Sequence, residues 1–336
     1  MNTISKKSSP RIFLWDNLKF ILIFFVVLGH FLETYTDISQ ASRSLFIFIY
    51  SFHMPAFMLI SGIFSKRNIN EKRYQKIFGY LILYIFTQLL LFVVQMQLGL
   101  ANSYSVLVED SVPWYAFALF AFNLITIALR NLDPKYLFIA AIVMGCFSGY
   151  NNSLSDFLVS SRIVVFYPFF LAGYYLDGQK LLEILTKWKI RILSLGIVLL
   201  WIFFIYSFPD FAYLARPLIT GRDHFDTIGP NYGIYRAIYY LATFILVFSI
   251  ISLVPNVKNI CSTLGARSVQ VYALHRGFIY IFYEALNGYH FMEQFSDITA
   301  QYVFAGLALL LTIILSLKIW SAPLQAILTP KWKNSK

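Results

Sequence analysis

Long apolar runs, many close to the length of a membrane-crossing helix, recur along the whole chain, and short polar segments separate them. About 20 apolar residues are needed to span the hydrocarbon core of a bilayer as a helix. Of the 336 residues, 59% are hydrophobic and only 13% are charged, whereas a soluble domain carries about 25% charged residues. This pattern predicts an all-α polytopic membrane protein and excludes soluble, disordered and disulfide-stapled classes.

Ten membrane spans are predicted, within a single integral-membrane domain over residues 1–336. The first run ends in a sequence that contains His30 and Glu33 and has no small-residue cleavage site, so it is predicted to be a retained helix and not a signal peptide. The ten spans cover approximately residues 18–35, 45–64, 77–97, 114–129, 136–150, 163–176, 190–208, 234–254, 269–286 and 302–320.

The distribution of charge fixes the predicted orientation. With the N-terminus inside, 21 of the 27 Lys and Arg residues fall in inside segments, and 11 of the 16 Asp and Glu residues fall outside. Basic loops are retained on the cytoplasmic side, so both termini are predicted to be cytoplasmic in a bacterial-type plasma membrane. The same rule accounts for the net charge of +11, so the expected partner is membrane lipid and not nucleic acid.

Four ionisable residues lie on one face of the first predicted helix: Asp16, Lys19, His30 and Glu33. Lys19 and His30 are 11 residues apart, which is about three turns at 3.6 residues per turn. Ionisable groups within a membrane usually face a bundle interior or a functional cavity. The alternative is that Asp16 and Lys19 are interfacial anchors and that His30 forms a hydrogen bond in helix packing.

The second predicted span contains His53 and Pro55, and Pro55 is expected to kink this helix so that freed carbonyls line a cavity. The densest basic cluster follows on the inside. One interpretation is that these residues set the membrane topology and contact phospholipid headgroups. The other is that they bind a phosphorylated cytoplasmic ligand. The cluster contains Lys66, Arg67, Lys72, Arg73 and Lys76.

Further polar residues lie in or near the outer half. Arg162 opens the sixth predicted span, and His275 and Arg276 lie at mid-depth in the ninth, where such groups must be paired or hydrated. The longest outer loop, residues 209–232, is either a functional element or a solvated cap, and it holds Arg222, Asp223 and His224. The His, Asp and Glu spacing does not indicate a metal site, and the two cysteines, Cys146 and Cys261, indicate no disulfide framework.

Several of these segments resemble the integral-membrane acyltransferase-3 family, and most closely its fucose 4-O-acetylase-like branch, which includes capsular-polysaccharide O-acetyltransferases. The Lys19-x10-His30 pair and the Ser51-Phe-His53-Met-Pro segment ending in Ser61-Gly62 carry most of the resemblance. Further matches are Arg11 to Lys19, Trp114-Tyr115, Phe166 to Gly173, Leu264-Gly265 and Val271 to His275, of which the aromatic segments are the weaker.

The resemblance implies ten helices, acetyl-CoA as a cytoplasmic donor and a sugar acceptor at the outer side of the membrane. In this family a basic residue followed eleven positions later by His marks the catalytic centre, and Lys19 and His30 match it. Basic pairs after the second helix are associated with the CoA side, where Lys66-Arg67 and Lys72-Arg73 match. Some relatives carry an additional SGNH esterase domain, for which the 336 residues leave no room.

Acetyl transfer to a sugar hydroxyl needs a base, and His is suited to that role near neutral pH. His30 is therefore expected to deprotonate the acceptor or to carry the acetyl group. Glu33 or Asp16 is expected to orient or charge-balance the stripe of ionisable residues on the first predicted helix. Substrate contacts or oxyanion stabilisation are expected from His53, Arg162 and His275, and glycan contacts from Arg276 and from Arg222, Asp223 and His224.

The expected acceptor is a capsular or exopolysaccharide, or its lipid-linked precursor, and a homo-oligomer is compatible with the sequence. The rival function is a transporter or flippase of a glycan or lipid intermediate, with His30 and Glu33 as a proton relay. A transporter of that kind predicts repeat symmetry between the two halves, which the sequence does not display. A third candidate function, a structural membrane scaffold, does not explain the aligned ionisable residues of the first predicted helix.

Overall fold

A computed structural model describes residues 11–105, 107, 111–151, 154, 157–222, 225, 231–322 and 324. These residues form helices joined by short connections, with no β-strand element within the described ranges. Six helical segments among them are long and apolar enough to cross a membrane: Phe13–Tyr35, Gln40–Asn70, Tyr74–Gln97, Trp188–Ser207, Tyr232–Leu253 and Asp297–Leu315. The all-α, multi-pass membrane fold predicted from the sequence is confirmed.

Each of the ten predicted spans lies mainly on helical residues. Four of them fall on helices that are shorter than a full membrane span, and the number of crossings stays a prediction. The main helices are α1 (Phe13–Leu32), α2 (Gln40–Tyr50), α3 (His53–Asn70), α4 (Tyr74–Gln97), α5 (Trp114–Leu129), α6 (Pro134–Phe147), α7 (Ser160–Tyr175), α9 (Trp188–Ser207), α12 (Tyr232–Leu253), α14 (Ser268–Tyr280) and α16 (Asp297–Leu315).

Short helices complete the chain: α8 (Gly178–Leu185), α10 (Pro209–Tyr213), α11 (Arg216–Thr220), α13 (Ile260–Gly265) and α15 (Gly288–Glu293). The segment predicted as a long outer loop therefore contains two short helices, α10 and α11. Arg43 of α2 holds this segment, because its guanidinium donates to the carbonyl of Thr36 at 2.9 Å and pairs with Asp210 at 3.2 Å.

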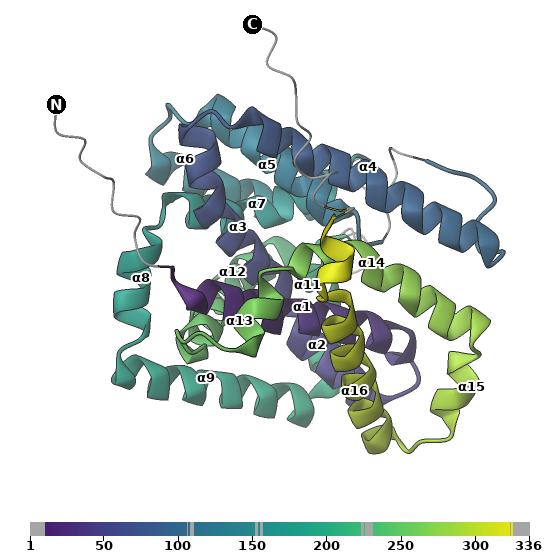
Figure 1. The fold of residues 1–336 in the computed structure, drawn as a ribbon. Helices are drawn as coiled ribbons and strands as arrows, with labels where there is room; N and C mark the ends of the chain where they lie inside the picture. Colours follow the sequence, from purple (N-terminus) through teal and green to yellow (C-terminus); the bar gives the residue numbers. More distant parts are fainter. Residues whose placement is uncertain are drawn as a thin grey trace, which may run out of the picture.

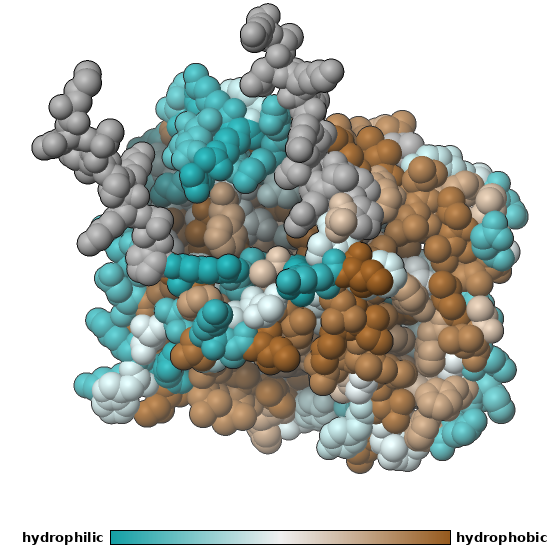
Figure 2. Space-filling model, in the orientation of Figure 1, coloured by the Kyte–Doolittle hydropathy of each residue, from teal (hydrophilic) through white to brown (hydrophobic). Residues whose placement is uncertain are grey.

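Helix α1 lies inside the bundle, and α4 and α9 lie along its opposite edges (Figure 1). Most of α1 is buried, whereas α9 exposes large apolar side chains such as Leu200 and Phe203. Figure 2 shows hydrophilic residues concentrated toward the left and right margins of one face, with hydrophobic residues between them over α9 and α16. This arrangement is stable where lipid contacts the apolar band and water contacts the polar margins.

The second predicted span is interrupted at Ser51 and Phe52, before Pro55, so the expected proline kink within one helix is wrong in detail. A proline inside a helix cannot donate to the carbonyl four residues earlier, and its ring clashes with that carbonyl. The chain ends α2 and begins α3 so that Pro55 lies in the first turn of α3, where no such donor is needed.

Side chains satisfy the carbonyls at this interruption. The Ser51 hydroxyl donates to the carbonyl of Phe48 at 2.7 Å, and His53 Nδ1–H donates to the carbonyl of Ile49 at 2.8 Å. The freed carbonyls are therefore bonded inside the protein and do not line a cavity.

Two hydrogen-bonding groups fix the N-terminal start of α1 against the α12–α13 connection. Asn17 donates to the carbonyls of Pro255 and Val257 at 2.8 and 2.9 Å, and Leu14 N–H donates to Asn256 Oδ1 at 3.0 Å. Helix α13 packs so closely on α1 that a Cβ added at Gly265 would lie 1.9 Å from the Asp16 carbonyl oxygen. These contacts hold the ionisable stripe of α1 in a fixed register.

The ten-span topology predicts opposite sides for two thiols. Cys261 in α13 should be cytoplasmic, and a cysteine introduced at the exposed Ser103, between α4 and α5, should be outside. In a Cys146→Ala background, a membrane-impermeant maleimide added to intact cells should label Ser103→Cys and spare Cys261 until the cells are permeabilised. Labelling of Cys261 in intact cells contradicts the topology.

Candidate functional site

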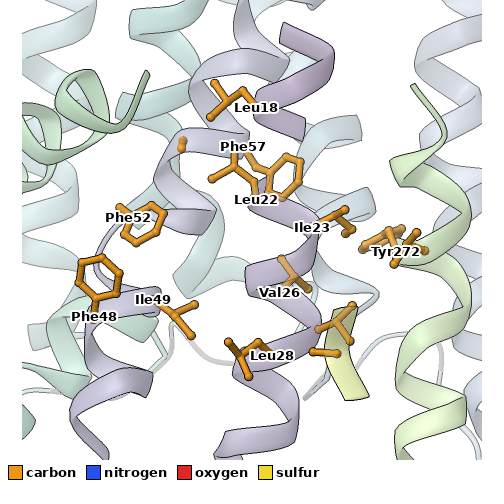
Figure 3. Packing of buried hydrophobic residues seen from close by; sticks show 14 of the residues in the cluster. Leu18, Leu22, Ile23, Val26, Leu28, Phe48, Ile49, Phe52, Phe57 and Tyr272 are labelled. Carbon is orange, nitrogen blue, oxygen red and sulfur yellow. The ribbon is translucent and has the colours of Figure 1, made fainter. Parts of the chain in front are cut away.

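A cavity of about 200 Å³ lies between α1, α3, α4, α5 and α14. The α1 wall consists of Lys19, Ile23, Val26 and His30, whose spacing of four, three and four residues follows one face of a helix. Figure 3 shows Ile23 and Val26 of α1, Phe57 of α3 and Tyr272 of α14 around this space. Lys19 and His30 are about 16 Å apart along α1, from 11 residues at 1.5 Å each.

The Lys19 end of the cavity is an ion-paired cluster. Lys19 Nζ lies 2.7 Å from Asp16 Oδ1, and Arg11 donates to Asp16 Oδ2 from Nε at 2.9 Å and from Nη2 at 2.6 Å. Lys19 Nζ also lies 5.5 Å from the ring centroid of Phe64, which lines the cavity. Asp16 therefore holds Lys19 in place, and Asp16 is not itself among the residues that line the cavity.

The His30 end combines residues from two distant parts of the chain. His30 Nδ1 lies 3.3 Å from Glu33 Oε2, and Arg276 Nη1 of α14 lies 3.2 Å from the same oxygen and 3.3 Å from His30 Nδ1. Glu33 can only accept, and Arg276 can donate to Glu33 instead of to His30, so the tautomer of His30 with its proton on Nδ1 gives all three groups a partner. That tautomer leaves the Nε2 lone pair free to accept a proton.

His275 and His53 lie next to this cluster, and both are buried. His275 Nδ1 lies 2.8 and 3.0 Å from the carbonyls of Val271 and Tyr272. A carbonyl can only accept, so Nδ1 of both histidines carries the proton and Nε2 is an acceptor. An acceptor does not stabilise an oxyanion, so neither histidine in this tautomer fits the expected oxyanion role, and neither is among the described residues that line the cavity.

Arg162 of α7 is buried beside the part of the cavity that Trp114 lines. Its guanidinium lies 5.1 Å from the ring centroid of Trp114, which lines the cavity, and Nη1 lies 3.5 Å from the carbonyl of Ser111. Arg162 is not itself among the lining residues. Arg222 lies in the segment after α11, and the predicted glycan contacts Asp223 and His224 lie outside the described residues.

The basic cluster lies at the end of α3 and in the turn that follows. Glu71 pairs with Arg67 Nε at 2.9 Å and also pairs with Arg73. The hydrogen bond from Arg67 lowers the pKa of the exposed Glu71 carboxyl below its usual value. Two arginines are thus held by one carboxylate, whereas Lys66 and Lys72 make no ion pair within the described part of the chain.

The chain matches a family model described as an acyltransferase domain over residues 13–317. The chain belongs to the acyltransferase-3 family. No curated protein and no solved structure matches the chain. The resemblance drawn from the Lys19-x10-His30 pair is therefore confirmed at the level of the family, while assignment to the polysaccharide O-acetyltransferase branch stays a proposal.

Membership in the acyltransferase-3 family gives the cavity its chemical context. The family match begins at the first residue of α1 and extends past the end of α16, so it includes every wall of the cavity. No group of three or more His, Cys, Asp or Glu is placed to hold a metal ion within the described ranges. The functional groups nearest the cavity are acid–base side chains and hydroxyl groups.

Three hydroxyl groups of this acyltransferase cavity belong to motifs named above but were not predicted as site residues: those of Ser61, Tyr115 and Tyr272. The Ser61 and Tyr115 hydroxyls are 2.8 Å apart, and both residues line the cavity. Tyr272 Oη donates to the carbonyl of Pro113 at 3.1 Å and accepts from Ala116 N–H at 3.2 Å, which fixes α14 against the start of α5. Tyr115 follows Trp114, and such a pair is typical of residues at the membrane interface. The sequence therefore did not indicate that Tyr115 lines the cavity.

Proposed function

We propose that the chain is a membrane O-acetyltransferase that moves an acetyl group from cytoplasmic acetyl-CoA to a hydroxyl of a cell-surface polysaccharide or its lipid-linked precursor. The observation that carries the proposal is a continuous cavity with Lys19 at one end and His30, held by Glu33, at the other. A donor that enters from one side of the membrane and an acceptor that enters from the other can meet in such a cavity.

The walls of the cavity suit the pantetheine arm of an acyl-CoA. Most of the lining side chains are apolar, and hydroxyls from Ser61, Tyr80, Tyr115 and Ser268 are spaced among them. The arm carries two amide groups, which are costly to bury unless they find hydrogen-bond partners. The hydroxyl groups can meet that need, and the apolar side chains can contact the methylene and dimethyl portions.

The proposed reaction needs one base that later acts as an acid. His30 takes the proton of the acceptor hydroxyl as its oxygen bonds to the thioester carbonyl carbon, and it then gives a proton to the departing thiolate as the carbon–sulfur bond breaks. Glu33 fixes the ring and stabilises the imidazolium that forms between these steps. Arg276 balances the charge of Glu33 in this partly buried cluster. An acetyl group carried on His30 itself is the second form of the same mechanism.

The basic residues at the end of α3 are proposed to bind the phosphates of the donor. Replacing Lys66 and Lys72 with Gln should raise the apparent Michaelis constant for acetyl-CoA, because each lysine that contacts a phosphate contributes a charge-assisted hydrogen bond. The rate of CoA release in inside-out vesicles measures this effect. Lys187→Gln with Lys189→Gln, near the start of α9, removes the same charge elsewhere and should leave the constant unchanged. Equal effects of the two double variants contradict the donor site.

Transfer itself is the test of the proposed function. Purified protein should move label from [¹⁴C]acetyl-CoA to a polysaccharide or lipid-linked glycan fraction taken from cells that lack the gene. NMR of surface polysaccharide from cells with and without the gene should show acetyl signals that depend on it. Movement of a glycan intermediate across the membrane without acetyl transfer supports the transporter alternative.

A further inference from the structure

The Nε2 atom of His275 is a buried hydrogen-bond acceptor with no partner among the described residues. The side chain is completely buried, and both hydrogen bonds of its ring are made by Nδ1, to the carbonyls of Val271 and Tyr272. Because Nδ1 holds the proton, Nε2 presents a lone pair. A buried acceptor without a donor is unfavourable, so this atom is a candidate for a contact that forms during the reaction.

The His30 ring is the neighbouring group that can supply the donor. The centroids of the His30 and His275 rings lie 5.4 Å apart, and their planes differ by 36°. An in-line N–H···N bond of about 2.9 Å between two imidazoles places the ring centres about 5 Å apart. The separation of the two ring centres is therefore close to the one that a direct hydrogen bond requires. No hydrogen bond between them is present in the structure, in which Glu33 and Arg276 contact His30 only at Nδ1.

We infer that His275 is a positioning residue that accepts a hydrogen bond from Nε2–H of His30 while His30 carries the proton of the acceptor hydroxyl. The inference rests on the proposed function. The acceptor O–H bond breaks, the new bond forms between its oxygen and the acetyl carbon, and the proton resides on His30. Glu33 then accepts from Nδ1–H, and Nε2–H is shared between His275 Nε2 and the reacting group in the cavity, until the proton passes to the sulfur of the leaving thiolate.

The arrangement gives each ring nitrogen of the imidazolium its own acceptor. Before protonation His30 has one N–H, which Glu33 binds, and His275 has no donor to bind. After protonation His30 has two N–H groups, and both acceptors are used. His275 therefore favours the charged form of His30 over the neutral form. The charged form is the one that must be stabilised between proton uptake and proton release.

Two substitutions separate this role from a purely structural one. In His275→Asn the side-chain amide nitrogen takes the position of Nδ1, so the bond to the backbone carbonyls is retained and the Nε2 acceptor is lost. In His275→Gln the amide oxygen can take the position of Nε2, so the acceptor is retained and the backbone bond is lost. Each substitution therefore removes the hydrogen-bonding function of one ring nitrogen of His275 and keeps that of the other.

The assay measures CoA thiol release with acetyl-CoA and the polysaccharide fraction from cells that lack the gene. His275→Asn should lose about tenfold to a hundredfold in turnover, with an unchanged Michaelis constant for acetyl-CoA and a thermal midpoint close to that of the wild type. His275→Gln should retain turnover within about threefold of wild type although its thermal midpoint falls.

An active His275→Asn with an inactive His275→Gln overturns the inference, because His275 then serves only to anchor α14. Equal losses in both variants, or no loss in either, also overturn it. His30→Ala is measured in parallel. If His30→Ala retains transfer, the proposed function itself fails; if it is inactive while His275→Asn is fully active, only the role of His275 fails.

Discussion

His30→Ala should abolish acetyl transfer while the protein remains inserted and folded. Removing a general base typically lowers the rate by about 10²–10⁴-fold, and His30 is the only histidine among the described residues that line the cavity. The replacement also removes the ring that Glu33 and Arg276 contact, but these two residues still pair with each other at 3.2 Å. The cluster therefore keeps a compensated charge, and loss of activity reports chemistry and not unfolding.

The matched control for this variant is His290→Ala. His290 lies on α15, is largely exposed and lies 3.5 Å from Glu293. Its replacement should leave acetyl transfer unchanged. The measurement is label moved from [¹⁴C]acetyl-CoA to the glycan fraction, together with thermal unfolding of the purified variant. Near-normal product from His30→Ala rules out His30 as the base or acetyl carrier.

Gly173→Ala should strongly destabilise the folded protein, because α3 and α7 meet through two glycines. A Cβ at Gly173 would lie 1.9 Å from the carbonyl oxygen of Leu59, and a Cβ at Gly62 would lie 2.0 Å from the carbonyl oxygen of Phe170. Backbone atoms cannot move aside as a flexible side chain can, so the helices must separate. Overpacking in a core costs about 1–3 kcal/mol and occasionally more, and close helix contact through small residues is a main source of stability in a membrane.

Gly196→Ala is the control for this experiment. Gly196 lies within α9, and nothing lies within 4 Å of a Cβ built at that position. Alanine is favoured over glycine inside a helix by about 0.5–1 kcal/mol, so the midpoint of thermal unfolding in detergent should stay the same or rise. An unchanged midpoint for Gly173→Ala contradicts the close packing of α3 on α7.

Features that depend on local periodicity could be predicted from the sequence. The apolar runs gave the helices, and the spacing of Lys19 and His30 placed both on one face of α1, where the structure has them along one cavity. The helix repeat is a property of neighbouring residues and needs no tertiary information. The interruption at Ser51 and Phe52 was misplaced by a few residues because Pro55 restricts the turn before it as well as its own position.

Features that depend on pairing between distant helices could not be predicted. Arg276 was expected to contact the glycan, but it pairs with Glu33 from the far end of the chain. Tyr115 and Ser61 come together although 54 residues separate them. One sequence carries no signal for which helices will be neighbours. His53 and His275 were identified as polar groups near the site, but their tautomers follow from backbone carbonyls that only the folded helices bring within reach.

The pairing of Glu33 with Arg276 has a consequence for the order in which the protein is made. His30 and Arg276 are 246 residues apart, which at roughly 5–20 residues per second corresponds to about 12–50 s of synthesis. Throughout that interval α1 is present with an acidic residue whose counter-ion has not been translated. The pair between Glu33 and Arg276 can form only after α14 has been made, so the reactive centre is completed near the end of translation.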